Sequence, residues 1–249
     1  MFRPIRLISL TFVSFSFLTS VFLATAYAQE VSVAKIPPKL IQANYDVTKN
    51  GQPFAKMKEQ FTVTGNSYKL ESVSKGVGVY ALFGERKLTS IGEVTPEGLR
   101  PTHFELRQGD NAKKFLFTDF DWANKILHMK VKNTVKDAVL TPGTQDLASY
   151  PYQFMFIPTA LKDAITVTLT TGKKLNQYPY KISAEHETIE SAGVQYKTLH
   201  LVPAGQDKSQ TETKELWLGA EQHYLPVRIL LVDENGEKLE QTLTELHVE

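Results

Sequence analysis

The sequence predicts a mainly β protein: a curved antiparallel sheet, or half-open β-barrel, with a central α-helix packed on its concave face. Three observations favour this fold. Apolar and polar side chains alternate through most of the chain, which is typical of strands with one buried and one solvated face. Turn residues recur about every 8–12 residues, as in all-β domains. Residues 145–157 alone break the alternation and show a helical period.

Alternation defines the strands in the first half of the chain. Ile41, Ala43, Tyr45 and Val47 share one face of the first expected strand. Further strands are expected on the residues that continue this pattern: Phe61 and Val63; Tyr68 and Leu70; Phe115 and Phe117; Ile126 and His128. Turns are expected between them at Asn50-Gly51, Gly65-Asn66, Pro96-Glu97-Gly98 and Gly109-Asp110-Asn111.

The same alternation resumes after the central stretch. Strands are expected around residues 165–169, 178–182, 196–201, 215–218, 224–232 and 239–248, separated by turns such as Asn235-Gly236. More than ten strands are expected in total. An open sheet of that size must curl or split into two layers, so the sequence predicts a half-barrel or a two-layer arrangement.

The central helix is predicted from spacing. The residues Leu147, Tyr150, Phe154, Ile157 and Leu161 fall at helical intervals and form an apolar stripe. Thr144, Asp146 and Ser149 can each cap a helix start. Pro151 favours a start at Tyr150, because its missing amide hydrogen needs no partner in the first turn. We expect a helix of about three turns.

One segment before the helix allows two interpretations. Residues 76–84 are apolar and bounded by glycines, with no charge between Lys75 and Glu85. The segment could be a buried corner or short helix that fills one end of the barrel. Alternatively, it is a mobile apolar flap at a ligand mouth, because exposed apolar patches mark interaction sites. In that case Val79, Tyr80, Leu82 and Phe83 are ligand-binding candidates.

The N-terminus predicts export. Arg3 and Arg6 precede an apolar run, and Ala26-Tyr27-Ala28 places small residues where a signal peptidase cuts. We expect a signal peptide over residues 1–28, cleaved after Ala28, and a periplasmic mature protein. An uncleaved membrane anchor is the alternative, which the polar residues within the run disfavour. A flexible leader over residues 29–39 and a single β-rich domain over residues 40–249 follow, with no later transmembrane segment.

Composition excludes several classes of function. The 28 Lys and Arg residues nearly balance the 27 Asp and Glu residues, so no nucleic-acid partner is expected. The chain has no cysteine, which excludes disulfides, thiolate metal sites and cysteine nucleophiles together. The domain must therefore be held by its apolar core.

No catalytic or metal motif emerges from the sequence. Ser149 lies outside any Gly-x-Ser-x-Gly context, and its spacing from Asp146 suits helix capping better than a triad. The six histidines are scattered without metal-ligand spacing. Glu185, His186 and Glu187 would point to opposite faces of a strand. We therefore expect no enzyme activity, no metal and no cofactor.

Four motifs in order resemble a bacterial exported family known as domain of unknown function 3108 (DUF3108). They are Tyr45 to Gly51; the Gly-Leu-Arg-Pro turn within residues 92–101; the Gln-Asp-x-x-Ser helix start within residues 143–149; and the Trp217, Leu225-Pro226 and Gly236 hairpin. The hairpin is also similar to that of periplasmic lipoprotein carriers of the Lol type. That resemblance implies a curved, unclosed barrel with a helical lid that shelters acyl chains.

These observations lead to two functional hypotheses. In the first, the protein is a non-enzymatic carrier or binder of a lipid or other apolar ligand in the cell envelope. The helix residues Tyr152, Met155 and Phe156 would then face a cavity, with Trp217 as a further lining candidate. In the second, the helix is buried all round, no cavity exists, and the protein is a scaffold or interaction module that binds an envelope protein.

Overall fold

The computed structural model describes residues 36–109, 115–156, 164–205 and 212–249. The predicted signal peptide and residues 29–35 of the predicted leader lie outside the described residues, as do Ile157 and Leu161 of the expected helix. Among the described residues, fifteen strands form one sheet. The expectation of a mainly β chain with more than ten strands is confirmed.

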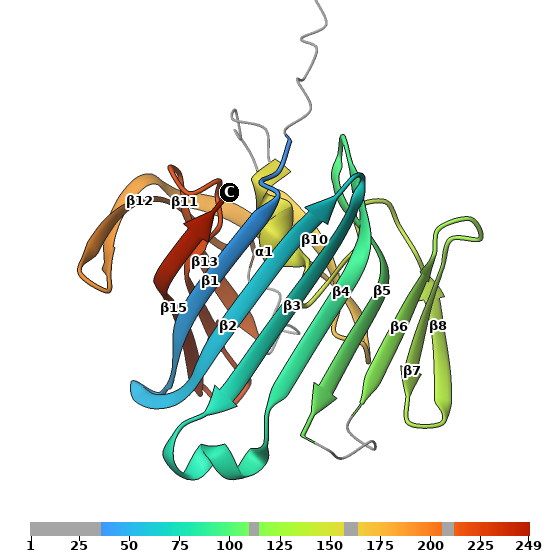
Figure 1. Cartoon of the computed structure of the whole chain (residues 1–249), viewed down its shortest axis with the longest axis horizontal. Helices are drawn as coiled ribbons and strands as arrows, with labels where there is room; N and C mark the ends of the chain where they lie inside the picture. The colour runs from blue at the N-terminus through green and yellow to red at the C-terminus, as the bar shows by residue number, and fades with distance from the viewer. Residues whose placement is uncertain (1–35, 110–114, 157–163, 206–211) are drawn as a thin grey trace, which may run out of the picture. The chain divides into compact units, whose positions relative to one another are not determined.

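The strands follow one another around the sheet in nearly sequential order (Figure 1). They are β1 (Leu40–Lys49), β2 (Gln52–Thr64), β3 (Ser67–Gly76), β4 (Arg86–Thr95), β5 (Gly98–Gln108), β6 (Leu116–Asp121), β7 (Ile126–Val131), β8 (Thr134–Val139), β9 (Gln145–Asp146), β10 (Ile165–Thr170), β11 (Leu175–Ser191), β12 (Val194–Pro203), β13 (Thr213–Gly219), β14 (Pro226–Val232) and β15 (Lys238–Val248).

The two ends of the described chain meet inside the sheet rather than at its edges. β1 pairs antiparallel with β15, so that one half runs from β1 to β8 and the other from β15 to β9. β8 and β9 are the two edges, and the large curved sheet is not closed between them. The only parallel pair among the described strands is β9 with β10.

Period-two alternation gives the sheet one apolar face, called the inner face here. A cross-strand row of Ile41, Phe61, Leu70, Ser90 and Phe104 illustrates it: each of the five is fully buried. In the other half the inner face is continued by Leu169, Leu201, Leu216, Leu218 and Val227. The strands form because every second side chain leaves water on this face.

The central segment is helical but shorter than expected. α1 spans Tyr150–Gln153 and is followed by the 3-10 turn η3, Phe154–Phe156. The start at Tyr150 agrees with the position of Pro151 in the first turn. The expected length of about three turns is wrong, because the α-helix ends at Gln153 and the chain tightens into a 3-10 turn. Gln145 and Asp146, before the helix, form β9 and pair with Leu169 and Thr170 of β10.

The helical segment joins the two halves of the core. Tyr152 and Met155 belong to a cluster built from β1 to β7, and the Tyr152 ring stacks on Phe61 at 5.2 Å. Tyr150 and Phe154 belong to a second cluster built from β10 to β14. The segment thus buries apolar side chains against both halves of the sheet.

Asp146 anchors this segment through buried hydrogen bonds. Its carboxylate accepts from the Ser90 hydroxyl at 2.6 Å and from the amides of Ala148 and Ser149 at 2.9 and 2.8 Å. The Ser149 hydroxyl in turn accepts from the Asp146 amide at 3.0 Å. Burial raises the pKa of Asp146 to about 6 against the opposing effect of these hydrogen bonds. The spacing suggested helix capping, but the N-cap residue Ser149 makes no side-chain hydrogen bond to the helix; the two side chains instead fix the turn that leads into α1.

A second anchor comes from the side chain of Gln153. Its Oε1 accepts from the Leu99 amide at 2.7 Å, and its Nε2 donates to the Glu97 carbonyl at 3.0 Å. Gly98 lies between these partners with φ +122°, and a Cβ there would sit 2.2 Å from the amide of Gln153. The β4–β5 turn can therefore approach α1 this closely only with glycine.

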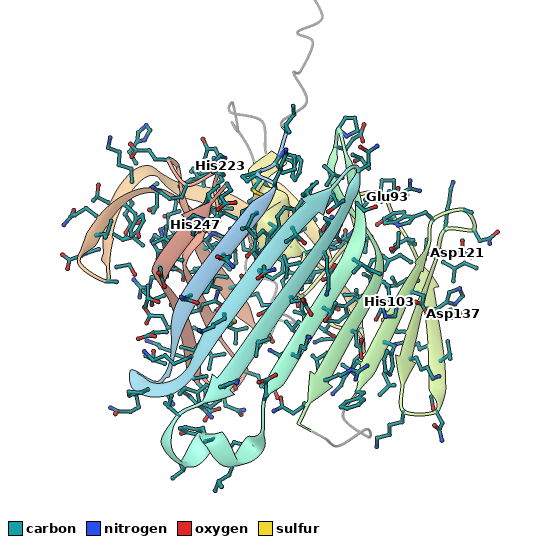
Figure 2. The ribbon with its side chains drawn as sticks, in the orientation of Figure 1. Glu93, His103, Asp121, Asp137, His223 and His247 are labelled. Atoms are coloured by element: carbon teal, nitrogen blue, oxygen red, sulfur yellow. The ribbon has the colours of Figure 1, made fainter. Side chains whose placement is uncertain are left out.

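We expect Asp146→Ala to lower the free energy of unfolding by roughly 2–5 kcal/mol, because two buried amides lose their acceptor and each unsatisfied group costs about 1–3 kcal/mol. Urea denaturation would measure this loss of stability. Asp137→Ala is the control: this exposed carboxylate on β8 contacts His128 (Figure 2), and its loss should cost less than about 1 kcal/mol. Equal losses in the two variants would contradict the anchoring role.

Candidate functional site

A cavity of about 620 Å³ lies between the inner face and the start of α1. Its size is within the range of about 300–1,000 Å³ typical of small-molecule sites. Strands from both halves of the sheet line it, together with α1 and the 3-10 helix η1 (Gly78–Phe83). The main apolar lining residues are Val47, Phe54, Ala55, Leu88, Leu147, Tyr150, Pro151, Ile229, Leu231 and Leu239.

The apolar walls follow from strand register. Val47 and Ala55 are cross-strand partners on β1 and β2, and Leu231 and Leu239 are partners on β14 and β15. Each lies at an inward position of the alternation. The wall on the helix side comes from Leu147, Tyr150 and Pro151, the residues that directly follow the Asp146 anchor.

η1, at the bottom of Figure 1, contributes residues to the lining of the cavity. It connects β3 to β4 and buries none of its residues: Val79, Leu82 and Phe83 are 73%, 89% and 64% exposed. The segment does contain a short helix, as the first interpretation allowed, but its exposure excludes a buried corner. Tyr80 and Phe83 still line the cavity, and the Tyr80 ring lies 4.6 Å from the ring of Phe54.

A hydrogen bond and a close backbone contact fix η1 to the sheet. The side chain of Gln108 on β5 donates to the carbonyl of Phe83 at 3.0 Å. Gly76 at the end of β3 approaches the Tyr80 carbonyl so closely that a Cβ would lie 2.3 Å from its oxygen. Apolar side chains are thus held exposed beside the cavity opening.

Charged side chains interrupt the apolar wall at three inward positions. Glu59 alternates with Met57 and Phe61 on β2, Arg86 alternates with Leu88 on β4, and Lys214 alternates with Leu216 on β13. All three charged residues line the cavity. Motif scanning missed them because they form no local motif. A charge at an inward position of an alternating strand is the signal that could have found them.

Glu59 titrates near neutral pH. Burial raises the pKa of its carboxyl to about 7, while the hydrogen bond from Tyr152 opposes the rise. The Tyr152 hydroxyl donates to Glu59 Oε2 at 3.0 Å. The same carboxylate and the burial of the ring raise the pKa of Tyr152 well above its ordinary value. A carboxyl of this kind in a cavity can hold or release a proton close to pH 7.

Lys214 is the most deeply buried of the three charges, at 5% exposure. Its Nζ lies 3.0 Å from Glu212 Oε1 and 4.6 Å from the centre of the Tyr178 ring. The ion pair and the aromatic face together compensate for much of the lost hydration.

Only some of the residues predicted to bind a ligand line the cavity. Tyr80 and Phe83 line the cavity, whereas Val79 and Leu82 are exposed beside it. The side chains of Tyr152, Met155 and Phe156 pack into the first core cluster, and Leu147, Tyr150 and Pro151 line the cavity in their place. Helical period alone could not tell these two sides apart.

Trp217 lies on the opposite face of the sheet from the cavity. Its neighbours Leu216 and Leu218 point to the inner face, so its own side chain points outward. There its ring stacks on His200 at 4.1 Å, and its Nε1 donates to Glu187 at 3.0 Å.

Four of the described histidines contact carboxylates: His103, His128, His200 and His247. His103 lies 2.6 Å from Asp119, and His247 lies 2.8 Å from Glu249 (Figure 2). Within the described ranges, no group of three or more His, Asp or Glu side chains is placed to hold a metal ion. No helix in that part of the chain is long and apolar enough to cross a membrane.

Comparison with known proteins relates the chain to families of unassigned function. The search of curated proteins found no match. A crystal structure of a beta-barrel-like protein of domain of unknown function DUF1849 from Brucella abortus is similar in fold, with a TM-score of 0.56 at 11% identity. The similarity covers 86% of this chain and 100% of that one.

The family model described as "Protein of unknown function (DUF3108)" matches residues 44–244. This range includes every residue that lines the cavity and most of the residues that the structure describes. The chain therefore belongs to the DUF3108 family.

Proposed function

We propose that this protein is a non-enzymatic binder or carrier of a lipid or another ligand with a long apolar part. The observation that carries the proposal is the cavity of about 620 Å³ with largely apolar walls. Apolar walls offer water few hydrogen-bond partners. An acyl chain that moves from water into this space is stabilised by about 25 cal/mol for each Å² of apolar surface buried.

In this proposal α1 covers the concave side of the curved sheet. The stacking of Tyr152 on Phe61 and the anchoring of Asp146 by Ser90 support this placement. The helix would then act as a fixed roof over the ligand, with Tyr150 and Pro151 in contact with it. The predicted signal peptide supports a periplasmic location, where lipids and lipoproteins must be shielded from water.

A second candidate function is that of an interaction module in envelope assembly. The exposed Val79, Leu82 and Phe83 on η1 favour it, because clustered exposed apolar side chains mark contact surfaces. A solid core was expected for such a module. The cavity volume corresponds to roughly twenty water molecules at about 30 Å³ each, and this favours ligand binding.

The first prediction concerns uptake of an apolar probe. The neutral fluorophore N-phenyl-1-naphthylamine should bind the full mature protein and gain fluorescence. Leu231→Trp places a larger side chain into the cavity, so we expect it to weaken probe binding at least about fivefold, because overpacking costs about 1–3 kcal/mol.

Leu230→Trp is the matched control for this experiment. Leu230 is the neighbour of Leu231 on β14, is partly buried in the same way, and points to the other face of the sheet. It should leave probe binding unchanged. A wild-type protein that takes up no probe, or equal losses in the two variants, would refute ligand binding in this cavity.

The second prediction concerns pH. The pKa of Glu59 is about 7 in the folded protein and 4.5 in the absence of perturbation. The folded state therefore keeps a proton that the unfolded chain releases. The resulting stabilisation is fully present below pH 4.5 and is lost as the pH rises through 7. The free energy of unfolding of the wild type, minus that of Glu59→Gln, should therefore decrease by on the order of 1–3 kcal/mol as the pH rises from 4.5 to above 7.

Urea denaturation at several pH values would measure that difference. Glu93→Gln is the control, because Glu93 is an exposed side chain on β4 (Figure 2). Its stability should follow the wild-type profile at every pH. A difference between wild type and Glu59→Gln that stays constant with pH would contradict the raised pKa.

A further inference from the structure

Arg86 is a cation without a partner at the wall of the cavity. It begins β4, with Ser74 of β3 and Gln108 of β5 as its cross-strand neighbours on the inner face. Among the described residues, its guanidinium has no hydrogen bond or ion pair to any side chain or backbone group. The nearby acid Glu85 pairs with Lys75 instead, at 3.2 Å.

This cation has lost part of its hydration. Arg86 is partly buried, and burial lowers the pKa of its guanidinium. The group nevertheless stays charged, because arginine is not deprotonated in proteins. A charge that is withdrawn from water without a counter-charge destabilises the ligand-free protein, and an anion that enters the cavity would relieve this cost.

The remaining charges of the cavity do not supply that anion. Glu212 is already paired with Lys214 at 3.0 Å. The Glu59 carboxyl accepts from Tyr152, and its pKa of about 7 leaves it uncharged in a large fraction of molecules at neutral pH. The net charge of the lining is thus positive or zero, which suits an acidic ligand.

On the basis of the proposed binding function, we infer that the ligand is a single-chain amphiphile whose acidic headgroup, a carboxylate or phosphate, pairs with Arg86. The planar guanidinium fork matches both headgroups in a bidentate geometry. Arg86 lies at the η1 end of the cavity, next to Tyr80 and Phe83. The headgroup would therefore sit near the opening, and the chain would run between Leu88 and Ile229 towards Tyr150.

The test is displacement of the neutral probe by ligands that differ only in their headgroup. Palmitate and hexadecanol have the same chain, whereas palmitate alone is charged. The wild type should bind palmitate about 10- to 100-fold more tightly than hexadecanol, the range of a charge-assisted hydrogen bond. Arg86→Gln should lower the affinity for palmitate to that for hexadecanol. Arg86→Lys should restore part of it.

Lys87→Gln is the matched control. It removes the same charge one residue away, from an exposed lysine that pairs with Glu71 at 2.7 Å. The Lys87→Gln variant should keep the preference for palmitate over hexadecanol. Calorimetry with dodecyl phosphate and with inorganic phosphate tests whether the anion must carry an alkyl chain. The affinity for dodecyl phosphate should depend on Arg86, as that for palmitate does, and inorganic phosphate alone should bind weakly.

The outcomes distinguish this inference from the proposed function. Probe uptake with no preference for palmitate over hexadecanol, or a preference that survives Arg86→Gln, overturns the headgroup assignment and leaves apolar binding in place. Tight binding of inorganic phosphate alone also overturns it, because the acyl chain would then be dispensable. A wild type that binds neither probe nor palmitate refutes the proposed function and the inference together.

Discussion

The buried carboxylate of Asp146 is the interaction on which the rest of the structure depends. It ties the connection between the two halves of the sheet to Ser90 of β4, while Gln145 and Asp146 pair with β10 in the other half. A single short segment is therefore hydrogen-bonded to both sides. The chain that follows this anchor forms α1. These hydrogen bonds therefore set the position of Tyr150 and Pro151, which form one wall of the cavity.

The cavity is a consequence of how a large sheet buries its inner face. Fifteen described strands in sequential order curl, and β1 and β15 join the two halves without closing the edges β8 and β9. Near α1 the apolar side chains of both halves meet Tyr152, Met155 and Phe154 and fill the space. Towards η1 none of the described segments fills the space in this way, so the same apolar faces line an open volume.

Charges at inward positions give this volume its chemical character. Burying an ionised side chain is costly unless a partner is present. Lys214 has Glu212 and two aromatic rings, and Glu59 has the Tyr152 hydroxyl. Arg86 differs from both, because no described group neutralises it. This asymmetry is the physical basis for assigning an acidic headgroup to the η1 end.

The sequence by itself determined most of the strands, the turns between them and the start of the helix, because these depend on local properties: alternation, glycine at turns such as Asn50-Gly51, and Pro151 in a first turn. It also supported membership of the DUF3108 family. Only the tertiary structure decided that Gln145 and Asp146 form a strand, that Tyr150 rather than Tyr152 faces the cavity, and that Trp217 points outward. These outcomes depend on which segments meet across the sheet, and a local pattern carries no record of a partner in another strand.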